Sequence, residues 1–186
     1  DLTQLPAIAA AIAGRSLDDP LLLFATILIA VGFSFKLAVV PFHMWTPDVY
    51  QGAPTSVTAF MAVASKAASF GAFMRVFVEG LGGVRANWSL LFLLLCIGTL
   101  ILGNIVALVQ TNVKRMLAYS SIAHAGYALI GVVAAGRLAP AEASSAVSGV
   151  MLYIALYAFM TFGAFTIIAM LRKGGLEGDE IDRKST

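Results

Sequence analysis

Three ionisable side chains lie inside long apolar stretches of this sequence, and each belongs to a residue type that can carry a proton. Lys36 and Lys66 interrupt two different apolar runs, and His124 lies in a third. A lysine at the centre of a membrane-spanning helix costs about 2.5–3.5 kcal/mol on insertion scales, so an offsetting interaction or a function is expected there. Because desolvation lowers the pKa of a lysine and a nearby carboxylate raises it, such a lysine can act as a switchable proton carrier.

Each of these residues also has a purely structural interpretation. A lysine can snorkel, with its stem on lipid and its ammonium at the interface, but Lys66 lies about ten residues, or roughly 15 Å, from either end of its run. Snorkelling is a stronger alternative for Lys36, which is nearer to the end of its run. His124 shares a helical face with Ser120 and Tyr127, and this pattern fits a proton relay and a hydrogen-bonded core histidine about equally well.

Pro41 predicts a break in the first apolar run. It follows Lys36 by about one turn, lacks a backbone N–H and crowds the carbonyl of Leu37, so a helix over residues 21–42 should bend or end there. Residues 43–55, with two prolines and a glycine, should not form a regular spanning helix. Broken helices in membranes are tolerated where the freed backbone groups face protein or water, which favours a hydrated path beside Lys36 over a simple packing kink.

The remaining polar residues of the apolar part give weaker signals. Ser65 and Ser69 could hold water near Lys66, although helix packing is the stronger interpretation of small hydroxyl residues. Asp48 and Glu79 lie near predicted membrane edges and are interpreted as loop or capping charges.

Composition indicates that these residues are set in membrane-spanning helices. The chain has 186 residues, of which 60% are hydrophobic and 12% charged, against roughly 25% charged in soluble domains. The net charge of +2, without a basic cluster among aromatics, argues against nucleic acid as a partner. The single cysteine, Cys96, excludes a disulfide framework and a cysteine-based metal site within the chain. Neither a redox-cofactor motif nor a phosphate-binding loop is found, so we expect no cofactor in this chain.

The apolar runs predict an all-α, polytopic bundle with about five membrane-spanning helices, since roughly 20 residues cross the hydrocarbon core. The predicted spans cover residues 21–42, 56–78, 88–109, 114–135 and 145–171. Residues 1–19 are expected to form a loop or interfacial helix, 20–172 the membrane domain, and 173–186 a soluble tail. The chain begins at Asp1 without a signal-peptide pattern, and we expect it to be an internal piece of a longer protein.

Basic residues are distributed unevenly between the two predicted sides of the membrane. One side would carry six of them, Lys114, Arg115, Arg172, Lys173, Arg183 and Lys184, and the other would carry four, Arg15, Arg75, Arg85 and Arg137. By the positive-inside rule, the first side is cytoplasmic, or faces the matrix in an organelle.

Two blocks of the sequence resemble a known family. Residues 35–54, with FKL followed by VPFHMWTPDVYQGAP, and residues 103–127, with GN, QTNVKR and YSSIAHAGY, are similar to subunit N of bacterial NADH-quinone oxidoreductase, respiratory complex I, called subunit 2 in mitochondria. The resemblance covers about residues 20–180. It implies an antiporter-like fold of two inverted five-helix repeats with broken helices and a line of charged residues at the membrane midplane.

The resemblance also implies a function and an environment. Lys36 would be the broken-helix lysine and Lys66 the central lysine of a proton-translocating subunit, with the acidic partner of Lys36 in sequence before Asp1. Electron transfer from NADH through FMN and iron–sulfur clusters to quinone would take place elsewhere in the complex, so the chain would be an enzyme subunit without a redox centre of its own. Its partners would be other membrane subunits, lipid and protons, in the bacterial inner membrane or the mitochondrial inner membrane.

Two other functions remain open. The chain could belong to a cation/proton antiporter that uses ion gradients without electrons, or to a membrane scaffold whose lysines only pair with neighbours. Related antiporters usually have histidine at position 66 and a block closer to W-L-P-D-A at residues 45–49, so Lys66 and Thr46 favour the complex I subunit.

Overall fold

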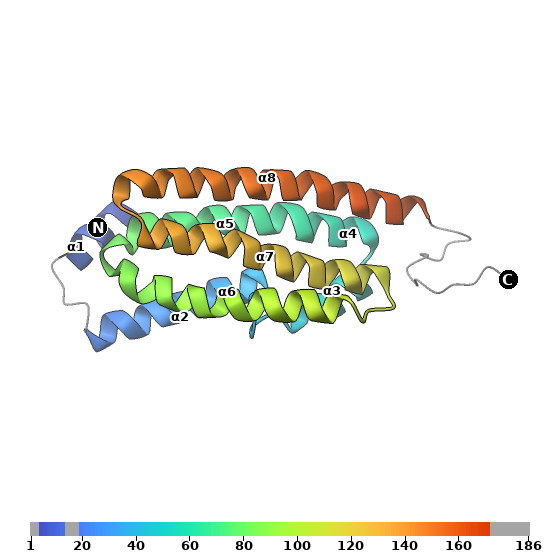
Figure 1. Ribbon diagram of the computed structural model, residues 1–186, viewed down its shortest axis with the longest axis horizontal. Coiled ribbons are helices and arrows are strands. Elements are labelled where there is room, and N and C mark those ends of the chain that lie inside the picture. Colours follow the sequence, from blue (N-terminus) through green and yellow to red (C-terminus); the bar gives the residue numbers. More distant parts are fainter. Residues whose placement is uncertain (1–3, 14–18, 172–186) are drawn as a thin grey trace.

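The computed structural model describes residues 4–13 and 19–171. Within them, five helical segments are long and apolar enough to cross a membrane: Pro20–Leu37, Thr55–Gly80, Gly82–Ala107, Val113–Arg137 and Glu142–Met170. They lie side by side as one elongated bundle, and the short helix α1 (Leu5–Ala13) covers one end (Figure 1). The predicted all-α bundle with five spanning helices is confirmed.

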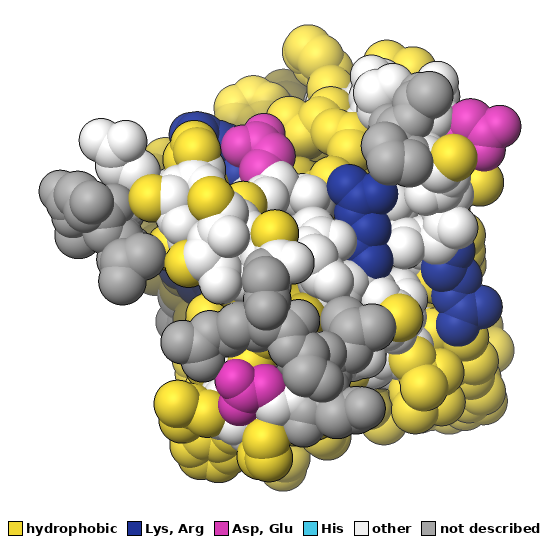
Figure 2. All heavy atoms as spheres, turned by 90° about the vertical axis from the view of Figure 1, so that its left-hand side faces the viewer, with side chains coloured by type: hydrophobic (Ala, Val, Ile, Leu, Met, Phe, Trp, Pro, Cys, Tyr) yellow, Lys and Arg dark blue, Asp and Glu magenta, His cyan; other side chains and the backbone are white. Residues whose placement is uncertain are grey.

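The bundle has the surface distribution that a membrane requires. Figure 2 shows the end that α1 covers, where charged and polar side chains gather on the face while hydrophobic side chains dominate the rim. Large apolar side chains are also exposed along the helices, with Phe24 and Leu28 on the first span, Leu94 and Ile101 on the third, and Phe159 on the last. Exposed apolar flanks with polar ends fit helices that lie in lipid or against other apolar helices.

The first span begins as its sequence predicts and ends earlier than the apolar run does. α2 (Pro20–Leu37) starts with proline in its first turn, and the Asp19 side chain accepts a hydrogen bond from the Leu21 amide at 3.0 Å. Its end is closed by Ala38 in the left-handed conformation, with φ of 60°. The Val39 amide then donates to the carbonyl of Ser34 at 2.8 Å, which satisfies a carbonyl at the helix end.

The predicted break near Pro41 is therefore confirmed, four residues ahead of the proline itself. The chain turns through residues 38–44 and continues in the short helix α3 (Trp45–Gly52). In Figure 1, α2 lies along the left part of the bundle and α3 along the right part. Residues 43–55 do not form a regular spanning helix, as expected, although most of them are helical.

The second span is one long rod that contains two irregular turns. It runs through α4 (Thr55–Phe60), the π-helical segment η1 (Met61–Ser65), α5 (Lys66–Met74) and a second π-helical segment, η2 (Arg75–Gly80). Short π segments within helices are rare, and those that occur are often found at functional sites. The sequence analysis did not predict either of them.

The last three spans are uninterrupted and follow a short 3₁₀ turn, η3 (Gly82–Val84). α6 spans Arg85–Ala107, α7 spans Val113–Arg137 and α8 spans Pro140–Met170. The Asn112 side chain caps α7 by accepting from the Arg115 amide at 3.0 Å. α8 starts five residues earlier than predicted, because Pro140 occupies its first turn, where a proline is tolerated.

Glycine allows α6 and α7 to approach each other closely. A Cβ atom on Gly103 would lie 2.8 Å from the backbone nitrogen of Ala123 and 3.0 Å from its Cα. At the other end of the pair, a Cβ on Gly136 would lie 2.6 Å from the ring of Trp88. Trp88 in turn packs in a buried aromatic cluster with Phe77, Phe92 and Phe73. Small residues at such contacts are typical of helix pairs in membranes.

Several expectations concern residues outside those that the structure describes. These are Arg15, the basic residues Arg172, Lys173, Arg183 and Lys184 of the last segment, and the soluble tail over residues 173–186. The predicted interfacial or loop helix at the start corresponds to α1, which packs against the second span through the contact of Leu5 with Gly80.

The α6–α7 contact yields the first testable prediction. We expect Gly103→Ala to destabilise the full-length protein by about 1–3 kcal/mol, because the new methyl group meets backbone atoms that cannot move aside. Gly163→Ala on α8 is the matched control, since nothing lies within 4 Å of a Cβ at that position. The measurement is the apparent melting temperature in detergent. Equal melting temperatures for the two variants would contradict the close contact.

Candidate functional site

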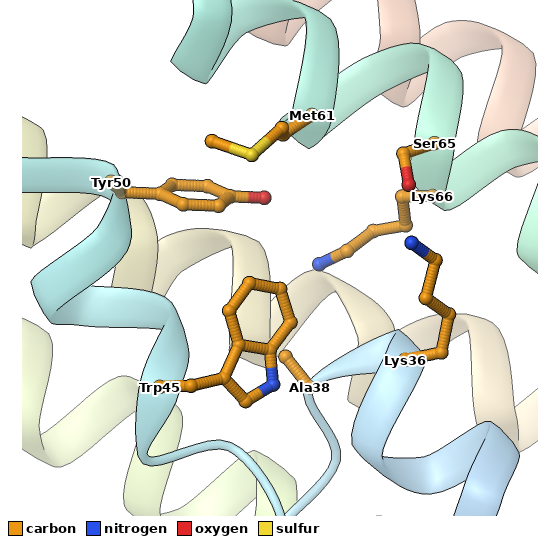
Figure 3. Close-up of a pocket in the computed structure, with 7 residues that line it drawn as sticks. All are labelled: Lys36, Ala38, Trp45, Tyr50, Met61, Ser65 and Lys66. Carbon is orange, nitrogen blue, oxygen red and sulfur yellow. The ribbon is translucent and has the colours of Figure 1, made fainter. Parts of the chain in front are cut away.

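A small cavity lies where the broken first span meets the second span. It has a volume of about 110 Å³, and both lysines line it (Figure 3). In Figure 3 the Lys66 ammonium and the Tyr50 hydroxyl of α3 extend towards each other, and the Lys36 side chain reaches up beside Lys66 and Ser65. The lining residues are Lys36, Ala38, Trp45, Tyr50, Met61, Ser65 and Lys66. The structure thus brings together two of the three predicted site residues.

Lys66 is the buried member of this pair. It is 4% exposed and begins α5 directly after the π segment η1. Its ammonium donates to the backbone carbonyl of Ser121 on α7 at 2.7 Å and to the Ser121 hydroxyl at 2.5 Å. The ammonium also lies 5.8 Å from the ring centroid of Tyr157 on α8. These partners turn the side chain into the bundle and supply the hydrogen bonds that a buried cation needs.

Lys36 lies in the last turn of α2 and is exposed. The early end of α2 places this lysine at the lip of the cavity, next to the turn at Ala38. Across residues 4–13 and 19–171, no carboxylate forms an ion pair with Lys36 or with Lys66. Both lysines therefore line one cavity whose other lining residues are neutral.

Three hydrogen bonds from α7 hold the second half of the broken span against the bundle. The Arg115 guanidinium of α7 donates to the Asp48 carboxylate at 2.6 Å and to the Gln51 side chain at 3.1 Å. One residue earlier on α7, the Lys114 ammonium donates to the carbonyl of Ala53 at 3.0 Å. α7 thereby holds both the start and the end of α3.

The two halves of the broken span are also linked directly. The indole nitrogen of Trp45 donates to the carbonyl of Phe35 at 3.0 Å, and the two aromatic rings lie 5.6 Å apart. This bond is the second one that the Phe35 carbonyl accepts, because the Ala38 amide also donates to it at 3.1 Å. It also sets Trp45 as the wall of the cavity opposite Lys66.

His124 lies on the far side of Tyr157 from Lys66 and does not line the cavity. Its Nδ1 atom is 2.6 Å from the Tyr153 hydroxyl, and its ring centroid is 5.0 Å from that of Tyr157. The Tyr157 hydroxyl is 2.7 Å from the Ser121 hydroxyl. A continuous set of polar contacts therefore runs from Lys66 through Ser121 to Tyr157, whose ring touches His124.

His124 and Tyr127 lie on one face of α7, as predicted, with ring centroids 5.7 Å apart. The hydrogen-bond partner of His124 comes from another helix, because it is Tyr153 of α8. The sequence analysis missed Ser121, Tyr153 and Tyr157. The available signal was a pair of tyrosines four residues apart in an otherwise apolar run, whose hydroxyl groups need partners within the membrane.

The structure also places the serine and carboxylate residues that gave weaker sequence signals. The Ser69 hydroxyl donates to the Ser65 carbonyl of its own helix at 2.6 Å, and Ser65 itself lines the cavity. Glu79 pairs with Arg75 one turn earlier at 3.6 Å. Asp48 lies in the first turn of α3 and holds Arg115. In the described part of the chain, no group of three or more histidine, cysteine, aspartate or glutamate residues could hold a metal ion.

Comparisons with known proteins agree with this architecture. Residues 2–183 match the family model described as NADH:quinone oxidoreductase/Mrp antiporter, TM. The chain is 46% identical over 180 residues to NADH-quinone oxidoreductase subunit N 2 of Solibacter usitatus, covering 97% of this chain and 35% of that protein. It is 51% identical over 163 residues to subunit N of Moorella thermoacetica, covering 88% of this chain and 33% of that protein.

A solved structure shows the same fold. A chain of respiratory complex I from Thermus thermophilus with bound aureothin aligns with a TM-score of 0.66 at 36% sequence identity, covering 89% of this chain and 38% of that chain. The chain thus spans about a third of the length of the curated relatives that it matches. By the match over nearly its whole length, the chain belongs to the membrane-subunit family of NADH:quinone oxidoreductases and Mrp antiporters, in which its relatives are subunit N of NADH-quinone oxidoreductase.

Proposed function

We propose that residues 20–172 form part of the proton-translocating domain of a complex I membrane subunit, with Lys36, Lys66 and His124 as proton-carrying residues and Pro41 as the structural break. The observation that supports this most is Lys66, a buried ammonium at the centre of a spanning helix that faces a cavity shared with a second lysine. A charge in this position costs free energy, and its presence therefore indicates a function.

Three features support an order for the proton path. Lys36 is exposed at the lip of the cavity and Lys66 is buried at its inner wall, so a proton would pass from Lys36 towards Lys66. Beyond Lys66, the hydroxyl groups of Ser121 and Tyr157 can each accept one proton and donate another. His124 contacts the Tyr157 ring and would follow as a separate proton carrier, which is hydrogen-bonded to the Tyr153 hydroxyl.

Lys36 is proposed to act as a switch. The ammonium would pair with a carboxylate from outside this chain in one state and with the neutral cavity in the other. Because a unit charge pair at an effective dielectric near 20 is worth about 4 kcal/mol at 4 Å, moving the partner away would change the proton affinity of the lysine strongly. Electron transfer from NADH to quinone, with its FMN and iron–sulfur clusters, is assigned to other subunits of the complex.

The nearest alternative is a cation/proton antiporter subunit, because the family description includes Mrp antiporters. The relatives named subunit N favour the redox-driven complex, and the bacterial relatives favour the bacterial plasma membrane over the mitochondrial inner membrane. Transport that depends on sodium and proceeds without NADH oxidation would establish the antiporter instead.

Substitution of Lys66 tests the central residue. In the full-length subunit within the assembled complex, Lys66→Ala should reduce NADH-driven proton pumping at least tenfold, because a helix-centre proton site is lost. Lys66→Arg should pump no better, since arginine remains charged. Ser69→Ala is the matched control, because that hydroxyl bonds only the carbonyl of Ser65. Pumping is measured in inverted vesicles, with assembly checked on native gels; normal pumping by an assembled Lys66→Ala complex would refute the role.

Substitution of His124 tests the secondary relay. His124→Ala should slow turnover a fewfold, and His124→Gln should recover part of the loss, because an amide can still hydrogen-bond the Tyr153 hydroxyl. Tyr153→Phe should behave like His124→Ala, whereas Tyr127→Phe, which keeps its ring contact, should stay close to wild type. NADH oxidation and proton pumping are recorded together. If His124→Ala and His124→Gln both keep the full rate, His124 is a packing residue.

Substitutions at the break test the switch. Pro41→Ala removes the residue that prevents helix continuation and should impair pumping more than assembly, and Lys36→Ala should impair pumping at least as much. Ala38→Gly is the matched control, because glycine accepts the positive φ of residue 38 and keeps the break. If Pro41→Ala pumps normally while Lys36→Ala does not, the lysine matters and the break is incidental.

A further inference from the structure

A groove lies at the end of the bundle where α6 begins and α7 ends. It has a volume of about 530 Å³ and shares no lining residue with the lysine cavity. The lining residues are Arg85, Ala86, Ser89, Leu90, Gly136 and Arg137. Figure 2 shows this end of the molecule, with basic side chains standing on its face.

The close contact between the two helices brings the arginines to one groove. Arg85 is the first residue of α6, and Arg137 is the last residue of α7. Gly136 permits this arrangement, because its missing side chain leaves room for Trp88 and Ser89 of α6. A Cβ atom there would come within 2.9 Å of the Ser89 side chain, so a larger residue would push the end of α7 away from α6.

Neither arginine has a counterion among the residues that the structure places. The Nε atom of Arg85 is buried without a hydrogen-bond partner. Arg75, at the same end of the molecule, does have one, because it pairs with Glu79. Arg137 lies at the negative end of the α7 dipole, where a cation is stabilised. Arg85 lies at the positive end of the α6 dipole, where a cation is destabilised. Two neighbouring positive charges, one of them poorly placed for its own helix, indicate an anionic ligand.

The surroundings of the groove indicate which anion. Leu90 forms its wall, and Leu94 and Ile97 continue from it along the exposed face of α6 at helical spacing. A ligand with an anionic head at the arginines could therefore lay an apolar chain along this helix. Arginine binds phosphate oxygens in a bidentate manner, and both arginines lie at helix ends, at the level where lipid headgroups border the hydrocarbon core. We propose that this groove binds the phosphate of an anionic phospholipid headgroup.

Photo-cross-linking of lipids tests this site in the complete complex. The complex, with the full-length subunit, is placed in phosphatidylcholine nanodiscs with a trace of phosphatidylglycerol that carries a photoreactive acyl chain. We expect labelling of peptides that contain residues 85–97, and none from a phosphatidylcholine probe with the same acyl chain. Arg85→Gln and Arg137→Gln should each reduce this labelling about fivefold, as expected for one arginine near an anionic headgroup.

Controls separate loss of the site from loss of the fold. Arg75→Gln removes a charge at the same end of the molecule and should leave the labelling unchanged, while Arg85→Lys keeps the charge and should retain most of it. The proposal fails if both lipid probes label equally, if labelling is the same in Arg85→Gln, or if an excess of inorganic phosphate displaces the lipid, which would identify a site for a free anion. Proton pumping is not part of the readout, so the result is independent of the proposed function.

Discussion

The buried ammonium of Lys66 is the constraint around which this bundle is organised. A cation inside an apolar bundle must find its hydrogen bonds within the protein, and here they come from Ser121 on α7. That requirement fixes the rotation of α5 and the register between α5 and α7. Tyr157 of α8 completes the arrangement by bonding the same serine hydroxyl. One buried charge thus determines how three helices face one another.

The break in the first span forms the part of the lysine cavity that lies across from the second span. An unbroken helix over residues 20–42 would carry its backbone past the lysine cavity and close it. The left-handed residue Ala38 and the following turn stop α2 at Leu37 instead. The indole of Trp45 bonds the carbonyl of Phe35, which also accepts the Ala38 amide, so the start of α3 is tied to the end of α2.

Sequence patterns predict those features that depend on one helix at a time. The five apolar runs, the break near Pro41 and the two lysines follow from hydropathy, proline chemistry and the cost of a buried charge. The partners of Lys66 and His124 could not be predicted, because an almost uniformly apolar helix such as α8 carries little periodicity that would reveal which face meets α7. The cavity could not be predicted from the sequence either, because it depends on where α2 ends and on the contacts that position α3.

The π segment before Lys66 could not be predicted from the sequence for a similar reason. Its extra residue changes the direction of the side chains that follow, and nothing in MAVAS distinguishes it from an ordinary helical turn. The groove between Arg85 and Arg137 combines residues from the ends of two helices, and only the close contact at Gly136 brings them together.

The attachment of α3 has a mechanical consequence. An eight-residue helix is too short to hold its own position, and its two ends are bonded to Arg115 and Lys114 at the start of α7. The same α7 supplies Ser121, two turns further on. Because α7 is one uninterrupted helix, any shift along its axis would displace α3, and with it the cavity wall, together with the Ser121 partner of Lys66.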